Sequence, residues 1–173
     1  YAIAKDASFN TVQVYRQAFK LNCVTGILFN HESPFRSPTF VTRKIVQGAL
    51  RCSKNLNHRI RLGNLDVARD WGWAEEYVDA MQLILRTDSL EAQVICTGRT
   101  VTLEYFVDKV FSELGLAWKE FVIIEDNLKR ASDINYSQGD PSAMKASHGW
   151  NATSDVDEVI KKLIDAENKK TLL

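Results

Sequence analysis

A tyrosine and a lysine stand four residues apart at the start of the chain, in Tyr1-Ala-Ile-Ala-Lys5. In a helix this spacing places both side chains on one face. A nearby ammonium favours the phenolate form of a tyrosine, so the pair could exchange a proton with a substrate hydroxyl. The pattern YxxxK is common by chance, and an ordinary pair on a helix surface is the alternative interpretation.

Further polar residues follow an apolar, β-branched run. The segment GILFNHESPFR carries Asn30, His31 and Arg36 where the run ends, and α/β folds bind their ligands at strand ends. Two more motifs follow: FVTRKI contains Thr42 and Lys44, and LGNLDVARDWG contains Arg69. A guanidinium has the right shape to bind a diphosphate. Arg69 could instead form a simple ion pair with the adjacent Asp70.

Alternating helices and strands must position these motifs, which predicts an α/β domain. Only the strands near residues 24 and 93 resemble the core strands of a sheet, and a doubly wound sheet needs more. Thr102 suits a helix N-cap, and Asp140 is expected to cap a short helix that follows it. We expect helices over 1–20, 40–51, 74–86, 102–114 and 155–168, strands over 22–30, 59–62, 92–97 and 121–125, and a loop over 31–39.

Composition limits the range of functions. The 173 residues contain 22 Lys and Arg against 22 Asp and Glu, so the balanced charge predicts neither a nucleic-acid partner nor an anionic membrane. No apolar run approaches the roughly 20 residues of a membrane-spanning helix. The three cysteines show no CxxC spacing, which predicts reduced thiols and no metal site. With no signal peptide in view, a cytoplasmic location is expected.

The motifs together resemble the GDP-mannose 4,6-dehydratase family of extended short-chain dehydrogenase/reductases. The resemblance rests on YxxxK, GILFNHESP, FVTRKI, RDWG and the YVDAM sequence after it, and it extends through VICTG to GDP and GW near the end of the chain. It implies an NAD(P)-binding Rossmann-like fold with a small α/β substrate-binding domain. Over 1–173 the two are expected to be intermixed, as the C-terminal portion of such a protein without its N-terminal cofactor-binding half.

The resemblance also implies a reaction. Family members convert GDP-mannose to GDP-4-keto-6-deoxymannose by internal hydride transfer through NADP and elimination of water, a step that leads toward GDP-fucose. They are commonly homodimers or homotetramers. Roles carried over by matching motifs are catalysis for Tyr1 and Lys5, NADP contact for Tyr1, Lys5, His31 and Arg36, and GDP-mannose contact for Asn30, Thr42, Lys44, Arg69 and Arg130.

The chain departs from the family pattern at several points. Ala2-Ile3-Ala4 follows the tyrosine where smaller residues are usual, and Phe35 replaces the first arginine of an Arg-Arg pair. The family's glycine-rich loop, its Ser/Thr partner and its glutamate base precede the tyrosine and are not in this sequence, so the chain alone is expected to be inactive. Alternative interpretations are a GDP-4-keto-6-deoxymannose reductase, an epimerase, or a non-catalytic nucleotide-sugar-binding module.

Overall fold

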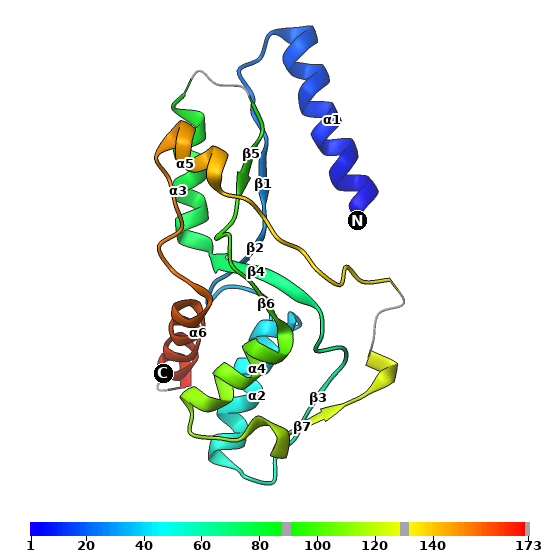
Figure 1. Cartoon of the computed structure of the whole chain (residues 1–173), viewed down its shortest axis with the longest axis vertical. Helices are drawn as coiled ribbons and strands as arrows, with labels where there is room; N and C mark the ends of the chain where they lie inside the picture. Colours follow the sequence, from blue (N-terminus) through cyan, green and yellow to red (C-terminus); the bar gives the residue numbers. More distant parts are fainter. Residues whose placement is uncertain (88–90, 129–131, 172–173) are drawn as a thin grey trace.

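Three small sheets of short strands succeed one another along the long axis of the molecule, with helices packed beside them (Figure 1). The computed structural model describes residues 1–87, 91–128 and 132–171. The α-helices are α1 (Ala2–Phe19), α2 (Val41–Lys54), α3 (Ala74–Leu85), α4 (Leu103–Glu113), α5 (Ser142–His148) and α6 (Val156–Thr171). The strands are β1 (Gly26–Leu28), β2 (Asn30–Glu32), β3 (Ile60–Leu62), β4 (Ala68–Trp73), β5 (Gln93–Ile95), β6 (Thr100–Thr102) and β7 (Val122–Ile124).

Most strand pairs are parallel, as the alternation of helices and strands predicts. β1 pairs with β5, β2 with β4, and β3 with β7, all in parallel, while β6 pairs antiparallel with β4. The two strands expected to belong to the core are therefore direct neighbours, with Gly26 opposite Gln93. These pairings confirm the α/β fold class.

The boundaries of several elements differ from the prediction. The single strand expected over 22–30 is two strands, because the chain changes partner at Phe29: β1 pairs with β5, whereas β2 pairs with β4. His31 and Glu32, expected in a loop, therefore belong to a strand. Strands β4 and β6 were not predicted. For β4 the reason is that RDWG contains charged residues and a glycine, which are not typical of a strand that is almost wholly buried.

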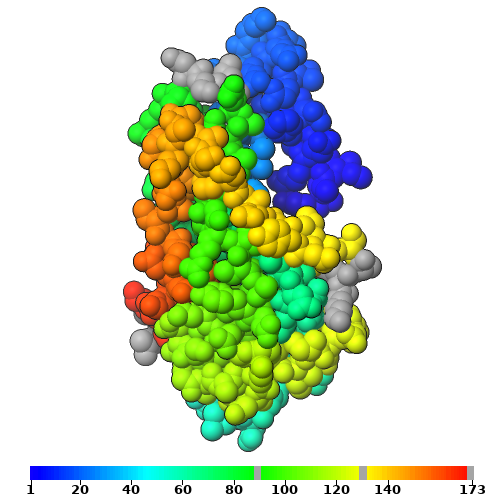
Figure 2. Space-filling model, viewed as in Figure 1, coloured from blue at the N-terminus to red at the C-terminus, as the bar shows by residue number. Residues whose placement is uncertain are grey.

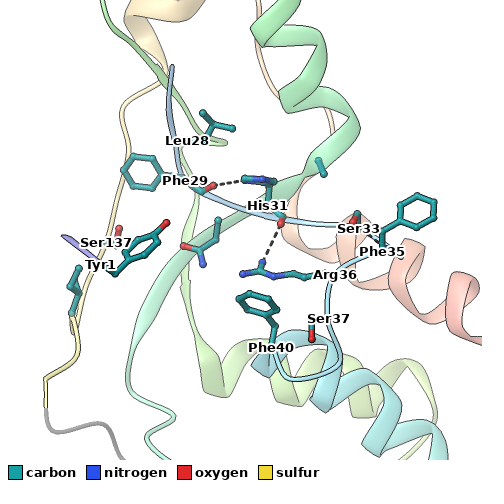
Figure 3. A pocket seen from close by; sticks show the side chains of 13 residues that line it. Tyr1, Leu28, Phe29, His31, Ser33, Phe35, Arg36, Ser37, Phe40 and Ser137 are labelled. Carbon is teal, nitrogen blue, oxygen red and sulfur yellow. Dashed lines mark hydrogen bonds between the residues drawn. The ribbon is translucent and has the colours of Figure 1, made fainter. Parts of the chain in front are cut away.

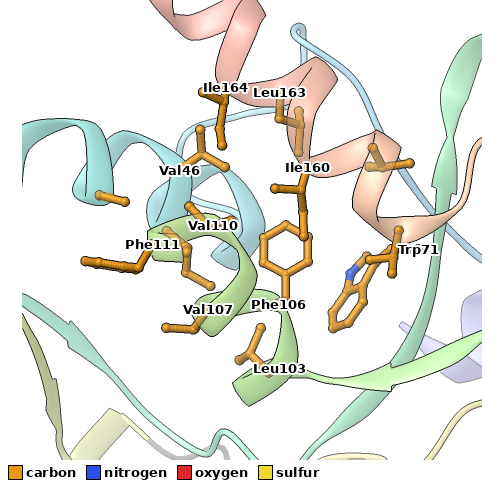
Figure 4. Close-up of a cluster of buried hydrophobic side chains, with 14 of the residues drawn as sticks. Val46, Trp71, Leu103, Phe106, Val107, Val110, Phe111, Ile160, Leu163 and Ile164 are labelled. Carbon is orange, nitrogen blue, oxygen red and sulfur yellow. The ribbon is translucent and has the colours of Figure 1, made fainter. Parts of the chain in front are cut away.

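The main hydrophobic core lies between α2, α4, α6 and β4 (Figure 4). Phe106 of α4 is fully buried and its ring centroid lies 5.2 Å from that of Trp71 on β4. Ile160 of α6 is fully buried in the same cluster. Thr102 caps α4 as predicted, because its Oγ1 accepts a hydrogen bond from Tyr105 N at 3.1 Å. For α5 the N-cap position is held by Pro141 and not by Asp140 as expected, although Asp140 accepts a hydrogen bond from Ser142 N at 2.9 Å.

Helix α1 stands apart from the rest of the molecule (Figures 1 and 2). None of its residues is buried, and Ile3 and Phe19 are 87% and 64% exposed. In the described residues no helix is long and apolar enough to cross a membrane. Cys23, Cys52 and Cys96 form no disulfide; Cys52 and Cys96 are buried.

Gly72 is required where β4 meets α3. A Cβ atom added to Gly72 would lie 2.4 Å from Cε1 of Tyr77, and Tyr77 is fully buried. We expect Gly72→Ala to lower the free energy of unfolding by about 1–3 kcal/mol, because the ring cannot move aside. Urea unfolding would measure this. In Gly72→Ala/Tyr77→Ala the clash is gone, so the two losses should sum to more than the loss of the double variant; additive losses would contradict the steric explanation.

Glu76 ties the first turn of α3 to the residues before α6. It accepts hydrogen bonds from Thr153 N at 2.9 Å, Thr153 Oγ1 at 3.0 Å and Ser154 N at 3.1 Å. Burial opposes ionisation, but the bonds from Ser154 and Thr153 outweigh it and hold the pKa of Glu76 below its usual 4.5. The ionised carboxylate therefore stabilises the fold above the pKa it has when unfolded, and this contribution is lost as the pH falls through the lowered value.

We expect Glu76→Gln to cost about 1–3 kcal/mol of unfolding free energy at neutral pH. The difference in unfolding free energy between Glu76→Gln and wild type should become smaller as the pH is lowered, and urea unfolding across a pH series would measure it. Glu75→Gln is the matched control, since Glu75 is the exposed neighbour in the same helical turn. If the difference in unfolding free energy became larger in acid, the ionised Glu76 carboxylate would not be the stabilising form.

Candidate functional site

Polar and aromatic side chains surround a cavity of about 760 Å³ beside the segment that leaves β1 and enters α2 (Figure 3). Its position at the carboxyl end of β1 is where α/β folds bind ligands. The lining residues are Tyr1, Leu28, Phe29, Asn30, His31, Ser33, Phe35, Arg36, Ser37, Phe40, Ala74, Ile134 and Ser137. Four residues predicted for the site, Tyr1, Asn30, His31 and Arg36, are thus brought together.

Tyr1 and Lys5 lie together at one side of this cavity. The Lys5 Nζ atom is 5.5 Å from the centroid of the Tyr1 ring, and Lys5 N donates to Tyr1 O at 3.0 Å in the first turn of α1. Tyr1 is 96% exposed and lines the cavity, whereas Lys5 does not. The helical spacing therefore brings an ammonium next to an accessible phenol, as the YxxxK pattern predicts.

His31 is oriented by its own backbone surroundings. Its Nδ1 lies 2.8 Å from Phe29 O and donates to that carbonyl, which fixes the orientation of the ring. The ring packs against Tyr77 with centroids 5.1 Å apart. Asn30 and His31 sit on β2 opposite Trp71 and Gly72, so the parallel pair β2–β4 fixes the cavity floor.

Arg36 lies across the cavity from Tyr1 and is held by three groups (Figure 3). Its Nη1 donates to His31 O at 3.1 Å and pairs with Oε1 of Glu32. Its guanidinium carbon lies 4.0 Å from the centroid of the Phe40 ring, a cation–π contact. Within the described part of the chain, Nε and Nη2 of Arg36 donate to no residue.

Glu32 is a site residue that the sequence reasoning missed. It is fully buried, and its Oε2 accepts a hydrogen bond from Thr42 Oγ1 at 2.7 Å. Burial raises the pKa of Glu32, while the Arg36 charge and the Thr42 bond oppose the rise. Thr42, predicted to contact substrate, is itself 1% exposed and lies behind the cavity wall. Glu32 stands next to His31 in the polar NHESP motif, and this position could have indicated from the sequence that Glu32 belongs to the site.

Lys44 and Arg69 do not line the cavity. Lys44 donates from Nζ to Arg61 O at 2.6 Å. Arg69 pairs through Nη2 with Asp133 Oδ1 at 2.8 Å. Arg69 therefore does form an ion pair, but with Asp133 and not with the adjacent Asp70 that the sequence suggested. Arg130 lies outside the described residues.

Asp70 links two strands and does not line the cavity. It is fully buried and accepts hydrogen bonds from Thr97 N at 3.1 Å, Thr97 Oγ1 at 2.8 Å and Gly98 N at 2.8 Å. Burial raises its pKa against these bonds. Asp70 thereby fastens β4 to the end of β5. The same burial and the Asp70 charge raise the pKa of the nearby Cys96 thiol to about 11, so Cys96 is a neutral thiol.

A distant segment supplies another part of the cavity wall. Ile134 and Ser137 line it, and their segment is held to β4 because Ala68 N donates to Asn135 O at 2.7 Å and Ser137 N donates to Ala68 O at 3.1 Å. The motifs that carry the family resemblance do not include Ile134 or Ser137.

Comparisons with known proteins agree with this architecture. The family model described as GDP-mannose 4,6 dehydratase matches residues 1–163. GDP-mannose 4,6 dehydratase 2 of Arabidopsis thaliana is 39% identical over 96% of this chain and 45% of its own length. The chain spans about half the length of the curated relatives it matches.

Solved structures support the fold. A UDP-glucose 4-epimerase from Thermotoga maritima, solved with UDP-glucose, has a TM-score of 0.87 at 19% identity over 99% of this chain and 54% of its own. RMD from Pseudomonas aeruginosa, complexed with NADPH, has a TM-score of 0.86 at 15% identity over 98% of this chain and 55% of its own.

Proposed function

This chain belongs to the GDP-mannose 4,6-dehydratase family, and from that premise we propose that it forms the part of a GDP-mannose 4,6-dehydratase that carries the catalytic tyrosine. The observation that carries the proposal is the single cavity shared by Tyr1, Asn30, His31 and Arg36. The reaction is the conversion of GDP-mannose to GDP-4-keto-6-deoxymannose. Tyr1 and Lys5 are its catalytic pair, and Asn30 faces the sugar.

The donor set of the cavity fits a nicotinamide dinucleotide, and we assign NADP. Arg36 offers free guanidinium N–H groups suited to phosphate oxygens, and Lys5 beside Tyr1 offers an ammonium suited to ribose hydroxyls. His31 and Arg36 would hold the cofactor, and a bound nicotinamide would supply the hydride acceptor and donor. RMD, of the same fold, was solved with NADPH.

The chain's own residues handle protons at the sugar C4 hydroxyl. As the sugar is oxidised, the phenolate form of Tyr1, favoured by the neighbouring Lys5 ammonium, takes the hydroxyl proton and becomes a neutral phenol. We propose that Thr42 and Lys44, with Arg69 and Arg130, act on the nucleotide-sugar side. For Thr42 the route is indirect, because it is buried behind the wall that it supports.

The base that removes the C5 proton must come from elsewhere. Among the described residues that line the cavity there is no carboxylate, and a general base must lie within hydrogen-bond reach of its proton. We propose that a cofactor-binding half supplies it and that residues 1–173 combine the remaining Rossmann elements with the substrate-binding region. The unburied α1 and the exposed Ile27 on β1 support this, since parallel sheets are normally covered. We further propose a homo-oligomer, as a dimer or tetramer.

Turnover in a chimera tests the proposal. The chain would replace the 167 matched residues of the Arabidopsis relative, and loss of one water from GDP-mannose in the presence of NADP would be followed by mass spectrometry. We expect turnover by the chimera and none by residues 1–173 alone. A chimera that is folded but acts on UDP-glucose in preference to GDP-mannose would overturn the substrate assignment.

A further inference from the structure

A single buried carboxylate joins the cavity wall to the helix behind it. Glu32 ends β2, and its side chain is 0% exposed. Its Oε1 pairs with Arg36, which lines the cavity, and its Oε2 accepts from Thr42 Oγ1 in the first turn of α2. Burying a carboxylate costs several kcal/mol even when it is paired. Its place here is therefore better explained by the geometry it imposes than by stability.

The geometry it imposes is that of Arg36. Glu32 and the His31 carbonyl both engage Nη1 of Arg36, and Phe40 covers one face of the guanidinium. The remaining edge, Nε and Nη2, donates to no residue in the described ranges and belongs to a side chain that lines the cavity. That edge is the fork that binds two oxygens of one phosphate.

We propose that Glu32 is a positioning residue, which holds Arg36 so that the free edge of its guanidinium faces a phosphate group of a dinucleotide in the cavity. The inference rests on the proposed function, which places such a ligand there. Glu32 is fully buried, and its side chain bonds to Arg36 and Thr42 among the described residues. A guanidinium fixed before binding loses less conformational entropy when the ligand arrives.

Trypsin digestion of the ligand-free chain tests the restraint on Arg36. Trypsin must bind the extended Arg36 side chain to cleave after it, so release of the side chain exposes the bond to Ser37. In Glu32→Gln we expect cleavage there to rise about tenfold relative to cleavage after Lys20 in the same digest, the ratio that corresponds to 1.4 kcal/mol. Glu125→Gln is the matched control, because it removes another glutamate–arginine pair, with Arg61.

A double-mutant cycle on NADPH affinity tests whether Glu32 strengthens cofactor binding through Arg36. Calorimetric titration of NADPH into the Arabidopsis chimera would give the dissociation constant for the wild-type chain segment, Glu32→Gln, Arg36→Ala and the double variant. We expect Glu32→Gln to weaken binding about tenfold when Arg36 is present and less than about twofold when it is absent. A merely structural role for Glu32 would weaken binding equally in both backgrounds.

The outcomes separate the two proposals. Unchanged trypsin cleavage and unchanged NADPH affinity in Glu32→Gln would overturn the positioning role. A folded wild-type chimera that binds no NADPH would overturn the proposed cofactor site, while the digestion would still decide whether Glu32 restrains Arg36. Should Glu32→Gln fail to fold, Thr42→Val removes the second tie to Glu32 and is expected to raise cleavage at Arg36 in the same direction.

Discussion

Replacing Tyr1 by phenylalanine in the Arabidopsis chimera is expected to lower turnover of GDP-mannose by about 10²–10⁴-fold, the usual contribution of a positioned proton-transfer group. The phenol oxygen is the only atom removed, and Tyr1 is 96% exposed, so the fold should not be affected. The Michaelis constant should change little, because the ring that lines the cavity is retained. Steady-state kinetics with detection of the dehydrated product would measure both parameters.

Tyr15→Phe is the control for this experiment. Tyr15 lies on the same helix, is half exposed and does not line the cavity, so its variant should match the wild-type chimera. Equal turnover in Tyr1→Phe and wild type would rule out Tyr1 as the proton carrier. Lys5→Met should also lower turnover, because it removes the ammonium beside the Tyr1 ring.

Replacing Asp70 by alanine is expected to lower the free energy of unfolding by about 2–5 kcal/mol. The change leaves Thr97 N, Thr97 Oγ1 and Gly98 N without their acceptor in a buried site. It also removes the side chain that fastens β4 to the end of β5. Urea unfolding followed by circular dichroism would measure the loss.

Two further variants distinguish lost hydrogen bonds from lost volume. Asp70→Asn keeps the shape and one acceptor oxygen, so its loss should be smaller than that of Asp70→Ala. Asp133→Ala removes a partly exposed carboxylate paired with Arg69, and exposed pairs contribute about 0–1 kcal/mol. If Asp70→Ala cost no more than Asp133→Ala, the bonds from Thr97 and Gly98 would not hold the two strands together.

Nearest-neighbour patterns in the sequence determined the local features of this protein. The four-residue spacing of Tyr1 and Lys5 placed them on one helix face, and Thr102 capped α4. Asn30, His31 and Arg36 reached one cavity because they are close in the chain and follow a buried strand. Helix periodicity and capping depend on residues a few positions apart, which one sequence displays directly.

Tertiary structure alone decided which distant groups meet. The sequence places Arg69 next to Asp70, yet Arg69 pairs with Asp133 while Asp70 binds Thr97 and Gly98. The reason is the alternation of a strand: successive side chains on β4 point to opposite faces, so neighbours in the chain cannot share a partner. β4 and the wall around Ser137 likewise depend on pairing between segments far apart in the sequence, which the local pattern of neither segment specifies.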